Sequence, residues 1–197
     1  LLQTYNFLDK PQGFATAGEM ETLQATSLGK RVAELYLDPF TANHLLEGYQ
    51  KSKTTFFGYL QLIAHTLEYR PLVTVKKGEV EAVEDQIAQN QQALLEEEPS
   101  YYDFEYGQYL ASIKMACCLR DWIGEADEQM LLERYNIRPG ELKAKLDIAE
   151  WLIQCSIQLL YINNNKEHTA QLVKLQKCLK YGAKQELLAL LRFKNVG

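Results

Sequence analysis

The chain has 197 residues, of which 47% are hydrophobic and 24% charged, and its formal net charge is −5. This composition is typical of a globular protein, and a chain of this length buries roughly 70% of its unfolded surface without needing disulfides or a structural metal. No apolar run approaches the ~20 residues of a transmembrane helix and no signal-peptide pattern is present, so we expect no membrane partner.

The first 39 residues predict a short helix, a β-hairpin and a second helix. The opening eight residues have a helical pattern, and Gly13 and Gly18 flank short apolar and threonine runs of the kind found in hairpins. Ser27 is expected to cap the second helix and Pro39 to end it. Helix, hairpin and helix in this order are compatible with the end of a winged-helix domain.

From about residue 40 onward the pattern is almost entirely helical. Glycine, proline and asparagine clusters separate the segments, and the clearest linker is the acidic and aromatic stretch around Pro99. The expected helices span 41–49, 54–67, 79–96, 105–122, 125–135, 139–162, 166–180 and 183–192. The predicted fold class is therefore mainly α, a helical bundle preceded by a partial winged-helix segment.

The segment 139–162 predicts one long helix with a single tryptophan on an unexpected side. At 100° per residue, six apolar residues fall within one narrow stripe that would pack on a core: Leu142, Leu146, Ala149, Ile153, Ile157 and Leu160. Trp151 lies about 180° from that stripe, on the face of Ala144, Cys155 and Gln158. It is expected either to enter a second core or to meet a partner.

The cysteines and histidines show none of the spacings that metal sites use. The sequence has no C-x-x-C pair and no H-x-x-x-H or H-E-x-x-H relation. We expect buried, reduced thiols in a cytoplasmic protein and no metal site. The residues concerned are Cys117, Cys118, Cys155, Cys178, His44, His65 and His168.

Patterns for catalysis are absent as well. Residues 27–32 contain a Gly-Lys pair but neither the preceding glycine nor the following Ser/Thr of a phosphate loop. There is no dinucleotide fingerprint and no nucleophile motif. Glu96, Glu97 and Glu98 stand beside Pro99 and are expected to be solvated. The residues by themselves predict a binding or structural module with no catalytic residue.

Charge is distributed unevenly along the chain. Residues 78–105 carry nine acidic side chains and no Lys or Arg, whereas residues 166–197 carry seven Lys/Arg against two Glu. A basic end of this kind attracts a phosphate backbone, although it is also compatible with a solvated helix face.

Four segments occur in an order that resembles a known family. They are "ATSLGKRVAELYLDP" (25–39), "KMACCLRDWIGE" (114–125), "RPGELKAKLDIAEWL" (138–152) and "KCLKYGAKQELLALLRFKNVG" (177–197). Together they resemble the C-terminal half of archaeal superfamily-two, Ski-two-type DNA helicases of the Hel family, which are related to the helicase domain of DNA polymerase theta.

The resemblance implies that the chain is one part of an ATP-dependent 3′–5′ DNA helicase acting in repair or fork restart. Residues 1–39 would end a winged helix, 40–194 would form a helical ratchet domain, and 195–197 would begin a truncated helix-hairpin-helix module. ATP and Mg²⁺ would bind to two RecA-like motor domains outside this sequence, so no cofactor is expected here. The expected partners are those motor domains and single-stranded or forked DNA, in a cytoplasmic, nucleoid-associated protein.

The resemblance also suggests a role for Trp151, which stands in an "AEW" motif that in the family stacks on a DNA base. The family's basic contact about two turns earlier would align with Ala144, so its neighbours Lys143 and Lys145 are candidates to replace it. Gln158 shares the face of Trp151, and Lys30 and Arg31 are candidates for backbone phosphates. Two other interpretations stay open, namely an RNA-helicase relative and a non-catalytic bundle that binds proteins.

Overall fold

The structure is a computed structural model that describes residues 1–9 and 23–192, with side chains described as far as Ala189. Its α-helices are α1 (Ser27–Glu34), α2 (Pro39–Gly48), α3 (Phe56–Ala64), α4 (Val80–Asn90), α5 (Tyr106–Ile123), α6 (Glu128–Tyr135), α7 (Pro139–Ile162) and α8 (Lys166–Tyr181). Three 3₁₀ segments, η1 (Leu67–Tyr69), η2 (Lys77–Glu79) and η3 (Gln185–Arg192), connect or follow them. The prediction of a mainly α fold is confirmed.

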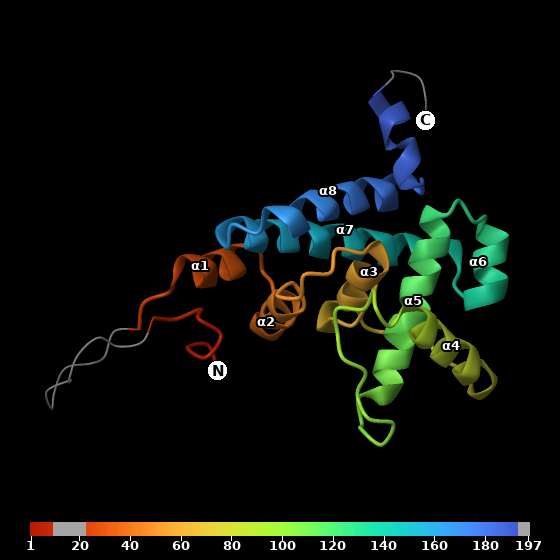
Figure 1. Cartoon of the computed structure of the whole chain (residues 1–197), viewed down its shortest axis with the longest axis horizontal. Coiled ribbons are helices and arrows are strands. Elements are labelled where there is room, and N and C mark those ends of the chain that lie inside the picture. Colours follow the sequence, from red (N-terminus) through yellow and green to blue (C-terminus); the bar gives the residue numbers. More distant parts are fainter. Residues whose placement is uncertain (10–22, 193–197) are drawn as a thin grey trace, which may run out of the picture.

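Helices α7 and α8 form a long antiparallel pair that spans most of the molecule, with the other helices along one side of it (Figure 1). Pro139 occupies the first turn of α7, where the lack of an N–H costs nothing, and the Glu141 carboxylate accepts the N–H of Arg138 at 3.0 Å. Asn165 caps α8 by accepting the N–H of His168 at 3.3 Å. The three-residue turn between the two helices makes them neighbours.

The predicted stripe of α7 is buried. Five of its six residues are at most 7% exposed, and Ile157 is half-buried against the same core. The buried surface is wider than the stripe, because α8 covers one side of α7 while α1, α2 and α3 cover another. Leu152, Cys155 and Leu159 are fully buried for that reason.

Polar side chains join four of these helices inside the core. The hydroxyl of Tyr49, the C-cap residue of α2, donates to Ser156 Oγ on α7 at 2.9 Å. The Tyr59 hydroxyl on α3 lies 2.9 Å from Nδ1 of His168 on α8, and Nε2 of His168 lies 3.0 Å from the carbonyl of Lys51. His168 is therefore a satisfied core residue, with one ring nitrogen donating and the other accepting.

The expected start of the chain differs from the structure. The first residues form hydrogen-bonded turns instead of a helix, and Leu8 pairs with Ala25 in an antiparallel bridge. Thr26, not Ser27, caps α1 by accepting the N–H of Gly29 at 2.9 Å. The helix ends at Glu34, well before Pro39, which instead begins α2. The predicted hairpin around residues 13–18 lies outside the described residues.

Two expected helices are shorter in the structure. The helix expected over 54–67 ends at Ala64, and the one expected over 79–96 ends at Asn90. After α4 the chain makes contacts with other parts of the fold in place of further helical turns. The Thr55 hydroxyl donates to the carbonyl of Ala93 at 2.7 Å, and Leu94 is buried. The last expected helix, 183–192, contains the 3₁₀ segment η3.

The observed burial of individual side chains confirms some predictions and corrects one. All four cysteines are free and buried, as expected. Trp122 packs on the core as well, and its indole N–H donates to the carbonyl of Leu179 at 2.8 Å. Glu96 is not solvated, since only 15% of its side chain is exposed and both His44 and His65 contact it.

Of the described helices, none has the length and apolar character to cross a bilayer.

Candidate nucleic-acid interface

Trp151 lies at the surface of α7. Its exposed fraction is 36%, so a second helical layer does not bury it. Ala144, seven residues before it, is exposed, and Gln158, seven residues after it, is half-buried. Because seven residues are close to two helical turns, these three side chains follow one line along α7. Cys155, on the same predicted face, is instead fully buried.

The two lysines that flank Ala144 have different surroundings. Lys143 is exposed and pairs with Asp147 one turn later at 2.5 Å, and that hydrogen bond raises the pKa of the Lys143 ammonium. Lys145 is half-buried, and its ammonium donates to the carbonyl of Pro71 at 2.7 Å and lies over the Tyr69 ring. Burial lowers the pKa of Lys145. Of the two, Lys143 is the more accessible to a phosphate.

Lys30 and Arg31 lie on α1, which packs on α7 at the end of the α7–α8 pair (Figure 1). The Lys30 side chain is exposed, and Arg31 forms an exposed ion pair with Glu34 at 2.9 Å. Such exposed pairs contribute little to stability, so Arg31 can exchange Glu34 for a phosphate at small cost.

A groove lies between α7, α8 and η3, and we call it the α8 groove. It was not predicted from the sequence. It has a volume of about 630 Å³ and is lined by Glu150, Lys174, Gln176, Lys177, Lys180, Tyr181, Gln185, Leu188 and Ala189. Lys174, Lys177 and Lys180 recur every three residues and form a row along α8. The excess of Lys/Arg in residues 166–197 was the sequence signal for this row.

Trp151 is close to the α8 groove along the helix. It directly follows Glu150, the α7 residue that lines the groove. One turn later, Gln154 accepts a hydrogen bond from Gln176 of α8 at 3.2 Å, which fixes the two helices side by side at this level. An exposed aromatic ring and a row of ammonium groups thus occupy the same stretch of the helix pair.

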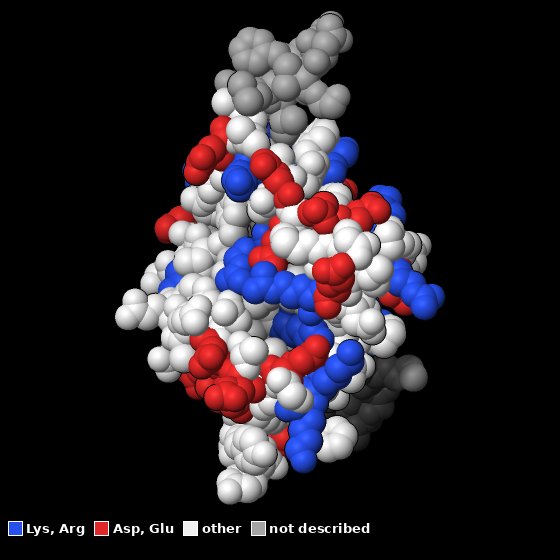
Figure 2. All heavy atoms as spheres, turned by 90° about the vertical axis from the view of Figure 1, so that its right-hand side faces the viewer, with Lys and Arg blue, Asp and Glu red and all other residues white. Residues whose placement is uncertain are grey.

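The end of the molecule formed by α4, α5 and α6 has mixed charge. Figure 2 looks at the end where α4, α5 and α6 lie, and there acidic and basic side chains are interspersed. Several of them form ion pairs, such as Arg134 with Asp121 at 2.8 Å and Lys114 with Glu79 at 2.8 Å. Interspersed charges produce a weaker field for an anion than a row of one sign.

The chain resembles known proteins over most of its length. A family model described as archaeal helicase, domain 4, matches residues 57–182. The ATP-dependent DNA helicase Hel308 of Thermococcus kodakarensis is 33% identical over 176 residues, which cover 88% of this chain and 16% of that protein. The proteins of the same name from Methanococcus vannielii and Methanocaldococcus jannaschii are 35% identical over 188 residues and 32% identical over 173 residues. The chain spans 24% and 14% of their lengths and covers a minor part of each relative.

Proposed function

This chain belongs to the archaeal helicase domain 4 family, and we propose that it guides single-stranded DNA through an ATP-dependent 3′–5′ helicase by base stacking on Trp151. The relatives that it matches are DNA helicases by name, which supports DNA as the ligand. In this proposal Mg²⁺ and ATP act in motor domains outside this sequence, and the present residues hold the strand between power strokes. A repair or fork-restart role is part of the same proposal.

The observation that carries the proposal is the exposed indole of Trp151 on α7, next in sequence to Glu150, which lines the same groove as the lysine row of α8. Every base has a π-face, so stacking on an aromatic side chain holds a strand of any sequence. The lysines of the α8 groove would neutralise phosphates and likewise read no sequence. A translocating helicase needs both properties, because its grip cannot depend on the bases that pass.

Single-strand binding tests the proposal. Affinity of the chain for a labelled oligothymidylate is measured by fluorescence anisotropy at low and moderate salt, with Trp151→Ala compared with the wild type. We expect Trp151→Ala to weaken binding by about 1–3 kcal/mol. Tyr161→Ala is the matched control, because Tyr161 is an exposed aromatic residue (79%) on the same helix.

The outcomes separate the interpretations. Equal binding by Trp151→Ala and the wild type contradicts stacking on this ring. A large fall in melting temperature for Trp151→Ala, followed by circular dichroism, would instead assign the ring a packing role. An affinity that does not change between low and moderate salt argues against an interface dominated by phosphate contacts. An oligouridylate of the same length, measured in parallel, distinguishes DNA from RNA preference through its 2′-hydroxyls.

A second candidate function, protein binding, has one observation in its favour. Tyr101, Tyr102 and Phe104, in the acidic loop between α4 and α5, are 68%, 93% and 93% exposed. Exposed aromatic side chains beside carboxylates are typical of protein interfaces. The motor domains of the same helicase are the partner that we propose for this loop. Alanine substitution of these three residues should leave binding of oligothymidylate unchanged, in contrast to Trp151→Ala.

A further inference from the structure

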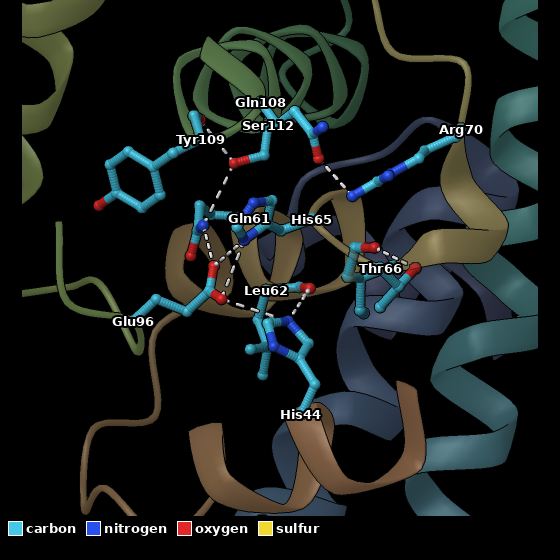
Figure 3. Close-up of polar contacts among 11 residues, drawn as sticks. His44, Gln61, Leu62, His65, Thr66, Arg70, Glu96, Gln108, Tyr109 and Ser112 are labelled. Carbon is cyan, nitrogen blue, oxygen red and sulfur yellow. Dashed lines mark hydrogen bonds and ion pairs between the residues drawn. The ribbon is translucent and has the colours of Figure 1, made fainter. Parts of the chain in front are cut away.

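His44, His65 and Glu96 come from three separate segments and meet at one point (Figure 3). His44 projects from α2, His65 directly follows α3, and Glu96 lies in the segment after α4. Nε2 of His44 is 3.2 Å from Oε1 of Glu96, and Nδ1 of His65 is 3.0 Å from the same oxygen. One potential ligand atom from each residue lies within 4.8 Å of the other two.

We propose that these three side chains form a binding site for a divalent transition-metal ion of the Zn²⁺ class. Zinc binds imidazole nitrogen at 2.0–2.1 Å and carboxylate oxygen at 2.0–2.2 Å, so neighbouring tetrahedral ligand atoms lie about 3.3 Å apart. The two histidine-to-carboxylate distances are already close to this value. The ion therefore needs only small side-chain shifts to fit among the three groups.

The carboxylate is held in place by an outer layer of hydrogen bonds. The buried amide of Gln61 donates to Oε2 of Glu96 and, at 3.2 Å, to Oγ of Ser112, which itself donates to the carbonyl of Tyr109 at 2.7 Å. The ring of His65 packs edge-on against Tyr109. Outer-layer partners of this kind orient metal ligands and raise their affinity (Figure 3).

The chemistry of the ligand set favours a borderline ion over Mg²⁺ or Ca²⁺. Imidazole nitrogen suits Zn²⁺, Co²⁺ and Ni²⁺, whereas Mg²⁺ and Ca²⁺ prefer oxygen ligands. One carboxylate and two neutral imidazoles reduce the charge of a divalent ion to +1. Each imidazole presents an unprotonated nitrogen when its proton sits on the other ring nitrogen, Nδ1 of His44 and Nε2 of His65, so His44 Nε2 gives up its 3.3 Å contact with the carbonyl of Leu62 when it binds the ion.

A coordination position remains for water or a small ligand. His44 and His65 both line a cavity of about 350 Å³ whose other walls include Thr41, Asn43 and Arg70. An ion held by two histidines and one glutamate leaves one tetrahedral position for water or a small ligand, and this cavity is the space that its two histidines line. The bound ion ties α2 and the end of α3 to the segment after α4, so it is expected to stabilise the fold. This site is independent of the proposed DNA contact.

Titration of the chelator-treated chain with Co²⁺ and Zn²⁺ tests the site. We expect one ion per chain, a visible absorption band of tetrahedral Co²⁺ that Zn²⁺ abolishes, and a melting temperature that rises with Zn²⁺. Glu96→Gln keeps the shape of the side chain, removes its charge and should weaken binding by at least about tenfold. Glu97→Gln is the matched control, because it makes the same charge change at a side chain that is 94% exposed.

A second substitution covers the case in which Glu96→Gln does not fold. His44→Gln replaces a ligand on α2 whose side chain is 29% exposed, and it should also lose the Co²⁺ band. The proposal is overturned if the wild type binds neither ion, or if folded Glu96→Gln and His44→Gln bind as tightly as the wild type. Equal weakening in Glu97→Gln would also overturn it, because binding would then follow overall charge.

Discussion

Tyr69 and Lys145 contact each other through both their side chains and their backbone carbonyls. The Tyr69 hydroxyl donates to the carbonyl of Lys145 at 3.0 Å, and the Lys145 ammonium lies 4.9 Å from the centroid of the Tyr69 ring. The same ammonium donates to the carbonyls of Tyr69 and Pro71. Lys145 therefore links the segment after α3 to α7.

We expect Lys145→Met to destabilise the fold. Methionine keeps the aliphatic length but leaves two carbonyl groups without their charged donor, and hydrogen bonds to charged groups contribute about 1.5–3 kcal/mol each in favourable cases. Because Lys145 is half-buried, we expect the lower end of this range. Urea denaturation measures the change. Lys143→Met is the control and should shift the free energy of unfolding by less than about 0.5 kcal/mol, since Lys143 is exposed.

Neutralising the lysine row of the α8 groove should reduce the salt dependence of single-strand binding. The triple change of Lys174, Lys177 and Lys180 to Gln removes up to three phosphate contacts, each worth about 0.7 in the slope of log K against log salt. Anisotropy titrations across a range of salt concentrations measure that slope. A control triple of Lys53, Lys76 and Lys77 to Gln makes the same charge change on exposed side chains elsewhere. Equal slopes in the two triples would contradict a role for the groove.

His168 should make stability depend on pH. Burial lowers the pKa of His168 below its ordinary value, so the unfolded chain takes up a proton first as the pH falls. The free energy contributed by the neutral ring is complete above an unfolded pKa of about 6.5 and is lost as the pH drops toward the folded pKa. Melting temperatures measured across this window should fall more steeply for the wild type than for His168→Gln. Parallel curves for the two proteins would show that His168 is not the titrating group.

Gly182→Ala should destabilise the end of α8. Gly182 has φ of +56°, and a Cβ there would lie 2.9 Å from Cζ2 of Trp122. The left-handed backbone alone costs an alanine about 1–2 kcal/mol. Gly140→Ala is the control in α7, where a Cβ meets no atom within 4 Å, and it should be neutral or slightly stabilising. Chemical denaturation of both variants gives the comparison, and equal effects would contradict the packing argument.

Local sequence patterns predicted the presence of the helices better than the residues at which the helices begin and end. The apolar period of α7 and the prolines and glycines around it are properties of neighbouring residues, so the helix over 139–162 was predicted at its observed bounds. The end of α4 was not, because it depends on the contact of Thr55 with Ala93, which are far apart along the chain. Thr26 rather than Ser27 caps α1, because Thr26 has the extended backbone of an N-cap whereas Ser27 is the first residue of the helix.

The sequence by itself determined the helical fold and the buried face of α7, because both follow from side chains at helical spacing, but it left open whether Trp151 enters a second core or meets a partner. Only the tertiary structure decided what surrounds these residues. It left Trp151 exposed, it brought Glu150 of α7 to the lysine row of α8, it turned Lys145 toward Tyr69, and it brought His44 and His65 to Glu96. These relationships join residues from separate helices, and the packing of those helices sets distances that no spacing along the chain encodes.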